Sequence, residues 1–399
     1  MNRNTMKIAT LTACVLAPLT AVAQPSGHDD HAGHVHYING PRVDAPIPRP
    51  GVDLSRGNFA VVVIDPQNDF LSPEGVAWGV VGESVTENGT VDAVRNVSFD
   101  VGHDEVLGIV GESASGKSVT AMSIPGLLPT PPAEIRGGRI VFDGVDVTAL
   151  PPRQRRHLRG AEIGVVFQDP MTSLNPVRRI GVQLTEGMRL HLGLSRSAAR
   201  QRAIELLDQV GIPSPDTRLR AYPHELSGGM RQRVMIAIAL SCEPRLLIAD
   251  EPTTALDVTV QAQIIDLVKS ISATREMAVI WITHDLSLLT SLADRTVVMY
   301  GGRIMEEGQT IDLYRSTAHP YTAGLLNSIV DIDTPRGMPL QSIGGSPPLG
   351  GATTRGCPFA PRCTHAVQQC RDDHPPSETI AGQHRTACWV RPFDAAASA

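Results

Sequence analysis

Apolar runs recur along the chain from about residue 105 onward, and each is followed at once by polar or glycine-rich residues. The runs lie in EVLGIVGESASGKSVTAM (105–122), VVFQDP (165–170), RLLIADEP (245–252) and VIWITHD (279–285). Continuous apolar runs of this length are typical of strands buried on both faces of a parallel sheet. The chemistry of such sheets collects at the carboxyl ends of the strands. The pattern therefore predicts an α/β fold with its site at those ends.

A helical pattern lies between the second and third of these runs. SRSAARQRAIELLDQVGI (195–212) begins with a serine cap, carries apolar residues on one side and stops at a glycine. The segment predicts a helical subdomain between Gln168 and the later strands. Its apolar side consists of Ala203, Leu206, Leu207 and Val210.

The first run leads into a complete phosphate-binding template, Gly-x4-Gly-Lys-Ser. Its glycines let backbone N–H groups turn toward phosphates, and the following helix points its positive end at them. Lys117 is expected to reach the β and γ oxygens, and the Ser118 hydroxyl to bind Mg²⁺. The predicted nucleotide-binding residues of this loop are Gly111, Glu112, Ser113, Ala114, Ser115, Gly116, Lys117 and Ser118.

Further motifs follow the loop in order, and their residues are Gln168, Ser227, Gly228, Gly229, Asp250, Glu251, Asp257 and His284. The Ser-Gly-Gly turn opens a helix and is a second backbone anion site. Asp250 and Glu251 end an apolar strand. Asp250 is placed to hold Mg²⁺ through water, and Glu251 to polarise the attacking water.

This ordered set resembles the ATP-binding cassette (ABC) ATPases over about residues 91–316. The resemblance implies an α/β P-loop fold with a RecA-like core, a helical subdomain and a partial antiparallel sheet. It makes 111–118 the Walker A loop, 227–229 the signature and Asp257 the D-loop residue. The implied catalytic residues are Glu251, His284 and Gln168, and the implied Mg²⁺ ligands are Ser118, Gln168 and Asp250.

Family mechanism implies a head-to-tail pair of such subunits with two ATP molecules between them. The signature of one subunit then caps the nucleotide held by the other. Ala114 departs from the family loop, which carries glycine there. Its methyl group is expected to strain the loop if the backbone φ is positive.

MTSLNP (171–176), HPYTAGLL (319–326) and a C-terminal extension (317–399) resemble the oligopeptide and dipeptide importer branch. The resemblance implies an ATPase that energises import of peptides, or of related solutes such as nickel complexes. Implied partners are two integral-membrane permeases, a second ABC ATPase in a homo- or heterodimer, and an extracytoplasmic solute-binding protein. The implied location is the cytoplasmic face of the plasma membrane.

Four cysteines crowd into the extension with the spacing C-x5-C-x6-C-x17-C: Cys357, Cys363, Cys370 and Cys388. Four thiolates from short loops bind an iron–sulfur cluster or zinc. The tight C-x2-C pairs of most zinc sites are missing. Members of the importer branch hold a [4Fe–4S] cluster with such cysteines, which favours the cluster. Disulfides compete only if the chain is exported.

The N-terminal residues follow other patterns. Residues 1–23 have the basic start, apolar run and small-x-small end of a signal peptide, which conflicts with a cytoplasmic ATPase. Residues 24–54 predict a flexible His- and Pro-rich linker. Residues 55–90 resemble the start of isochorismatase-like cysteine hydrolases, with Asp65 ending the strand in VVVIDPQNDF. The lysine and cysteine partners of that family are missing, so a hydrolase is the weaker alternative.

ABC-like sequence begins only around Val91, so we expect the cassette to lack its first strand and the aromatic residue that stacks on adenine. Trp78 is the only aromatic residue just upstream. A fusion of two genes, real or artefactual, explains this seam, and a defective product with little ATPase activity is a further alternative. The 399 residues carry a net charge of −6, which gives no basic field for nucleic acid.

Overall fold

The computed structural model describes residues 6–16, 91–130, 133–169, 173–254, 256–329, 342–347 and 355–393, with the backbone alone for 6–16. The predicted linker (24–54) and hydrolase-like fragment (55–90), including Asp65 and Trp78, lie outside these ranges. None of the helices in the described ranges combines the length and apolarity that crossing a bilayer requires.

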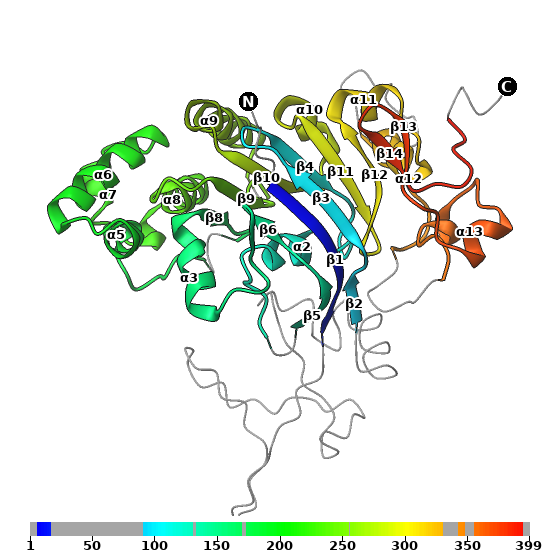
Figure 1. Ribbon diagram of the computed structural model, residues 1–399. Helices are drawn as coiled ribbons and strands as arrows, with labels where there is room; N and C mark the ends of the chain where they lie inside the picture. Colours follow the sequence, from blue (N-terminus) through cyan, green and yellow to red (C-terminus); the bar gives the residue numbers. More distant parts are fainter. Residues whose placement is uncertain are drawn as a thin grey trace, which may run out of the picture.

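The centre of the fold is an eight-stranded sheet that is parallel in its middle (Figure 1). The four strands that the apolar runs predict are all in it, as the α/β interpretation requires. In spatial order the strands are β13 (Glu378–Ala381), β14 (His384–Thr386), β12 (Arg303–Gln309), β11 (Arg295–Tyr300), β4 (Val106–Val110), β10 (Ala278–Thr283), β9 (Leu246–Asp250) and β8 (Ile163–Val166).

The sheet is buried on both faces because its strands are apolar at successive positions. Along β4, Leu107 and Ile109 pack into one core cluster, while Val106 and Val110 pack into the other. All four are at most 6% exposed. Alternation of side chains along a strand explains this division. A strand buried on both faces is fixed in register, and so are the loops at its ends.

Helices flank the sheet and form a separate lobe at one end of it (Figure 1). The lobe contains α6, which begins at the Ser195 cap and buries the four apolar residues that the sequence placed on one side. The helices are α2 (Lys117–Ser123), α3 (Pro152–Ala161), α5 (Ile180–His191), α6 (Arg196–Gln209), α7 (Pro215–Arg218), α8 (Gly228–Leu240), α9 (Val258–Arg275), α10 (Leu286–Leu292), α11 (Thr310–Arg315), α12 (Pro320–Asn327) and α13 (Gln368–Asp372).

The antiparallel sheet contains a strand at the position that we expected to be empty. Residues of the signal-like segment form β1 (Met6–Leu16), which lies between β2 (Val91–Val94) with β3 (Val97–Val101) on one side and β5 (Ala133–Gly138) on the other (Figure 1). A short hairpin of β6 (Val141–Phe142) and β7 (Val145–Asp146) follows β5. The cassette therefore has a first strand, taken from the far N-terminus.

The C-terminal extension continues the central sheet. Strand β14 pairs with β12, so that Thr386 lies opposite Glu306, and β13 pairs with β14. The Glu306 carboxylate is fully buried and accepts hydrogen bonds from the Ala318 N–H (2.7 Å) and the His319 N–H (3.1 Å). It also lies 2.8 Å from Nε2 of His384. Backbone and side-chain bonds thus join the extension to the ATPase.

Candidate nucleotide site and cysteine-lined cavity

The predicted phosphate loop joins the end of β4 to the start of α2. Gly116 has φ of +95°, and a Cβ there would lie 2.7 Å from the Ala93 carbonyl oxygen. Only glycine meets both requirements without strain. The Lys117 ammonium donates to the carbonyl oxygens of Gly111 (2.7 Å) and Glu112 (3.0 Å). The backbone of the loop therefore holds the Lys117 ammonium through two carbonyl oxygens.

Three loop residues, Ser113, Ala114 and Ser115, bear on the expected nucleotide contacts. Ala114 has φ of +62°, so the backbone conformation that makes its methyl group costly is present. The side chains of Ser113 and Ala114 are exposed. The hydroxyl of Ser115 is buried and has no hydrogen-bond partner among the described residues.

Asp250 ends β9, the neighbour of β10, and faces the phosphate loop. Its Oδ1 accepts a hydrogen bond from the Ser118 hydroxyl at 2.9 Å. Burial raises the pKa of Asp250 to about 6, and the bond from Ser118 opposes the shift. The Asp250 carboxylate and the Ser118 hydroxyl are oxygen ligands of the kind that divalent cations bind. A cation here would compensate the negative charge of a carboxylate that burial has removed from water.

Glu251, the next residue, is the meeting point of the other predicted catalytic groups. Its Oε2 lies 3.2 Å from Nε2 of Gln168, 3.2 Å from Nδ1 of His284 and 3.1 Å from the Thr254 hydroxyl. Its φ of +44° is rare for a residue with a side chain. Strain of this kind is often found at functional sites.

Glu251 and His284 shift each other's pKa. The hydrogen bond from His284 lowers the pKa of Glu251, and the same bond raises the pKa of His284. Burial lowers the pKa of Lys117, whose ammonium is 3.9 Å from Oε1 of Glu251. The carboxylate is thus held charged beside cationic and polar groups, where it is able to accept a proton from water.

The predicted signature residues lie elsewhere, at the start of α8. Ser227 caps this helix and accepts from the Met230 N–H at 3.3 Å. Ser227 and Gly228 are exposed, and a Cβ on Gly228 would meet nothing within 4 Å. Asp257 caps α9 in the same way, accepting from the Val260 N–H at 2.9 Å. Both caps leave their helix ends open to a partner.

Comparison with known proteins decides the family. Residues 94–254 match the family model of the ABC transporter, and residues 305–370 match that of the oligopeptide/dipeptide transporter C-terminal region. The chain is 48% identical over 306 residues to the dipeptide transport ATP-binding protein DppD of Bacillus subtilis, covering 77% of this chain and 91% of the relative. It is 47% identical over 304 residues to the oligopeptide transport ATP-binding protein OppD of Salmonella typhimurium, covering 76% and 90%.

The chain belongs to the ATP-binding subunits of the oligopeptide/dipeptide ABC transporter family. It is an ATPase of the ABC type. Among solved structures it is similar to the cassette MJ0796 in a post-hydrolysis state bound to ADP and Pi, with a TM-score of 0.51 and 27% identity, covering 56% of this chain and 93% of that one.

The four cysteines of the extension of this ABC ATPase line one cavity, together with His319 and Trp389. All four thiols are free, and Cys357 and Cys370 are buried. Burial raises the pKa of Cys357 to about 12, and the neighbouring thiols add to the rise. The Cys357 N–H donates to the Cys370 carbonyl oxygen at 2.8 Å. Within the described ranges no group of three or more His, Cys, Asp or Glu side chains has the geometry of a metal site.

Sequence reasoning missed two residues that contact the phosphate loop from the extension. Arg362 forms an ion pair with Glu112, and the Tyr321 hydroxyl accepts from the Glu112 N–H. Tyr321 lies in HPYTAGLL, quoted above for the importer resemblance, and Arg362 lies in GCPFAPRC (356–363), between the first two cysteines of the extension. An arginine placed between two of the four cysteines was the available signal.

Proposed function

We propose that this ABC ATPase energises import of peptides, or of related solutes such as nickel complexes, at the cytoplasmic face of the plasma membrane. The observation that carries the proposal is the gathering of Gln168, His284 and Lys117 around Glu251. Relatives that the chain covers over 91% and 90% of their length are named for transport of dipeptides and oligopeptides.

In this proposal Glu251 polarises the attacking water and accepts its proton, while His284 orients the carboxylate and contacts the transferred phosphate. Ser118, Gln168 and Asp250 would hold Mg²⁺, which when bound neutralises charge on the phosphates. Backbone groups of 111–118 bind the phosphates. Ser227, Gly228, Gly229 and Asp257 would complete the site of a second ATPase subunit in a dimer.

Replacing Glu251 tests the proposal. With permeases and solute-binding protein in vesicles, Glu251→Gln should lower ATP turnover by roughly 100-fold or more, because general-base groups contribute about 10²–10⁴. ATP should stay bound, and uptake should stop. Glu205→Gln, on the exposed side of α6, is the matched control and should keep turnover. Normal turnover in Glu251→Gln, or no stimulated turnover in the unaltered chain, would refute the proposal.

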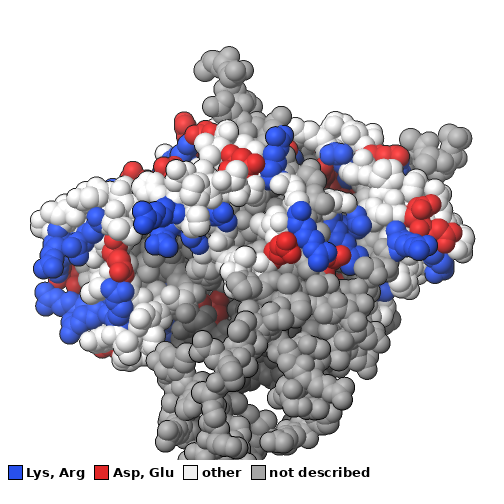
Figure 2. All heavy atoms as spheres, turned by 60° about the horizontal axis from the view of Figure 1, so that its bottom comes forward, with Lys and Arg blue, Asp and Glu red and all other residues white. Residues whose placement is uncertain are grey.

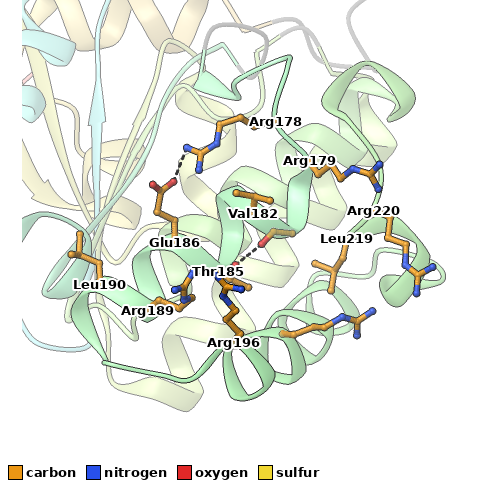
Figure 3. Close-up of a pocket in the computed structure, with 12 residues that line it drawn as sticks. Arg178, Arg179, Val182, Thr185, Glu186, Arg189, Leu190, Arg196, Leu219 and Arg220 are labelled. Atoms are coloured by element: carbon orange, nitrogen blue, oxygen red, sulfur yellow. Dashed lines mark hydrogen bonds and ion pairs between the residues drawn. The ribbon is translucent and has the colours of Figure 1, made fainter.

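A pocket in the helical lobe supports docking of a permease. It is lined by Arg178, Arg179, Arg189, Arg196, Arg200 and Arg220, with Glu186 as its one acidic lining residue (Figure 3). Arginine side chains, blue in Figure 2, gather on this lobe at the left of the view. Val182 and Leu190 are also exposed there, at 47% and 75%. Arginine beside exposed apolar side chains suits a permease segment that carries acidic and apolar residues.

Charge reversal tests this docking site. Arg189 and Arg196 have no ion-pair partner within the described ranges, so Arg189→Glu with Arg196→Glu breaks no internal bridge. We expect the double variant to lose co-purification with the permeases. Arg371→Glu, an exposed residue of the extension that likewise has no ion-pair partner within the described ranges, is the control and should keep it. Equal co-purification of both would contradict docking in this pocket.

For the cysteine-lined cavity we propose a [4Fe–4S] cluster held by Cys357, Cys363, Cys370 and Cys388. What supports the proposal is that four free thiols, two of them buried, line one cavity, and a [4Fe–4S] cluster takes four thiolates. Anaerobically purified protein should contain iron and absorb visible light, and Cys370→Ser should lose both. Cys242→Ser, which changes a cysteine of the ATPase core, should keep both. Zinc without iron in the purified protein would overturn the choice of metal.

A further inference from the structure

The cysteine-containing extension is tied directly to the phosphate loop by one arginine. Arg362 Nη1 lies 2.6 Å from Oε2 of Glu112, and Nη2 lies 3.0 Å from Oε1, so the pair is bidentate. The Arg362 side chain is 5% exposed and that of Glu112 is 26% exposed. A planar, two-bond pair of this kind fixes orientation as well as distance.

The guanidinium is itself held by the extension, so it is not a mobile partner. Its Nε donates to the Gly344 carbonyl oxygen at 2.8 Å, and Nη2 donates to the Ile343 carbonyl oxygen at 3.1 Å. Nη1 also donates to the Tyr300 hydroxyl at 3.1 Å. Because Arg362 precedes Cys363, the backbone that carries it also forms part of the cysteine-lined cavity.

A second contact holds the backbone of the same loop residue. The Glu112 N–H donates to the Tyr321 hydroxyl at 2.8 Å. The Tyr321 ring packs against Tyr300 (4.6 Å between centroids) and against Phe359 (5.3 Å), two residues from Cys357. Both the carboxylate and the N–H of Glu112 are therefore held by groups outside the loop.

Glu112 in turn sets the place of the loop lysine. The Glu112 carbonyl oxygen accepts from the Lys117 ammonium at 3.0 Å, beside the bond from Lys117 to Gly111. A displacement of Glu112 would move one of the two oxygens that position this ammonium. Lys117 is the group expected to reach the terminal phosphates.

We propose that Arg362 is a positioning residue for the phosphate loop, and that through it the cysteine-lined cavity controls affinity for ATP. The coupling runs from the backbone between Cys357 and Cys363, through Arg362, to Glu112 and Lys117. The inference rests on the ATP site of the proposed function, and it holds for any occupant of the cavity that orders this backbone.

Equilibrium ATP binding to the full chain tests the coupling. Arg362→Gln should raise the Kd roughly tenfold, equal to about 1.4 kcal/mol. Glu112→Gln should raise it by a similar factor. The double variant should bind no more weakly than either single one, because each change breaks the same pair. The Kd of Arg362→Lys should lie between those of the unaltered chain and Arg362→Gln, since an ammonium keeps the charge but not the bidentate geometry.

Arg385→Gln is the matched control. It breaks another ion pair between extension and ATPase, Arg385 to Glu307 at 3.2 Å, without touching the loop. Its Kd should equal that of the unaltered chain. If Arg362→Gln does not fold, Arg362→Lys is measured instead. Its loss of affinity for ATP should vanish when Glu112→Gln is also present.

Two results would overturn the inference. One is a Kd unchanged by Arg362→Gln or Arg362→Lys. The other is a loss that persists undiminished in the Glu112→Gln background, which would mean that Arg362 merely stabilises the extension. Neither result touches the proposed function, which fails instead if the unaltered chain binds no ATP. Iron content and melting temperature, measured on the same samples, separate loss of the pair from loss of the cavity.

Discussion

Removing residues 1–23 takes away β1, the strand that fills the antiparallel sheet. This is also the segment that signal-peptide cleavage after Ala23 would remove. In the described backbone, Ile8 lies opposite Phe99 and Thr12 opposite Gly137, so β1 is paired along both edges. One molecule cannot lose this segment to cleavage and keep it as a strand.

The cost of the truncation follows from the neighbours of β1. Val97, Phe99 and Val101 of β3 are 0%, 5% and 0% exposed. Burying one such side chain contributes about 1.5–3 kcal/mol, so uncovering about half of each of the three costs roughly 2–5 kcal/mol. Whole domains are stable by about 5–15 kcal/mol. We therefore expect the antiparallel sheet to open locally while the central sheet stays folded.

Native-state hydrogen exchange measures this opening. A local loss of about 3 kcal/mol should reduce amide protection roughly 100-fold in peptides covering 91–101 and 133–138. Peptides from β9 and β10 should keep their protection. Thr12→Pro should act in the same direction, because proline interrupts a strand paired on both edges. Equal protection of β3 and β5 in the full and truncated chains would refute the pairing of β1.

Two smaller changes test local strain and burial. Ala114→Gly should relieve the positive φ and raise the free energy of unfolding by less than about 1 kcal/mol, since glycine also gains freedom in the unfolded chain; weaker ATP binding would contradict this. Burial lowers the pKa of His319 to about 4, despite Glu306 and with help from His374, and its Nδ1 accepts from the Tyr321 N–H at 3.0 Å. Unfolding restores the ordinary pKa of about 6.5. The contribution of neutral His319 to the free energy of unfolding is therefore fully present above about pH 6.5, and it falls by up to about 1.4 kcal/mol per pH unit toward pH 4. Melting temperature against pH should flatten in His319→Asn, which caps the helix without titrating; an unchanged slope would exclude His319 as the cause.

The sequence predicts those parts of the site whose residues lie at, or just after, the carboxyl end of a strand. Asp250 and His284 follow neighbouring parallel strands, and Lys117 follows the strand beside them, so topology alone brings these groups to one edge. Partners that the sequence does not pair, such as Glu112 and Arg362, lie 250 residues apart and meet through tertiary packing. The sequence also does not predict the pairing of β1, because its apolar run fits a signal peptide and a buried strand equally well.

The buried carboxylate of Glu306 explains why the extension and the ATPase act as one unit. A fully buried charge is tolerated only with donors around it, and the three donors to Glu306 come from Ala318, His319 and His384. All three follow residue 316, where the sequence suggested that the ATPase ends. Removing them would leave a charge inside the sheet at a cost of about 3–5 kcal/mol. The extension thus completes the sheet that carries the phosphate loop, which is why its residues Arg362 and Tyr321 reach Glu112 of that loop.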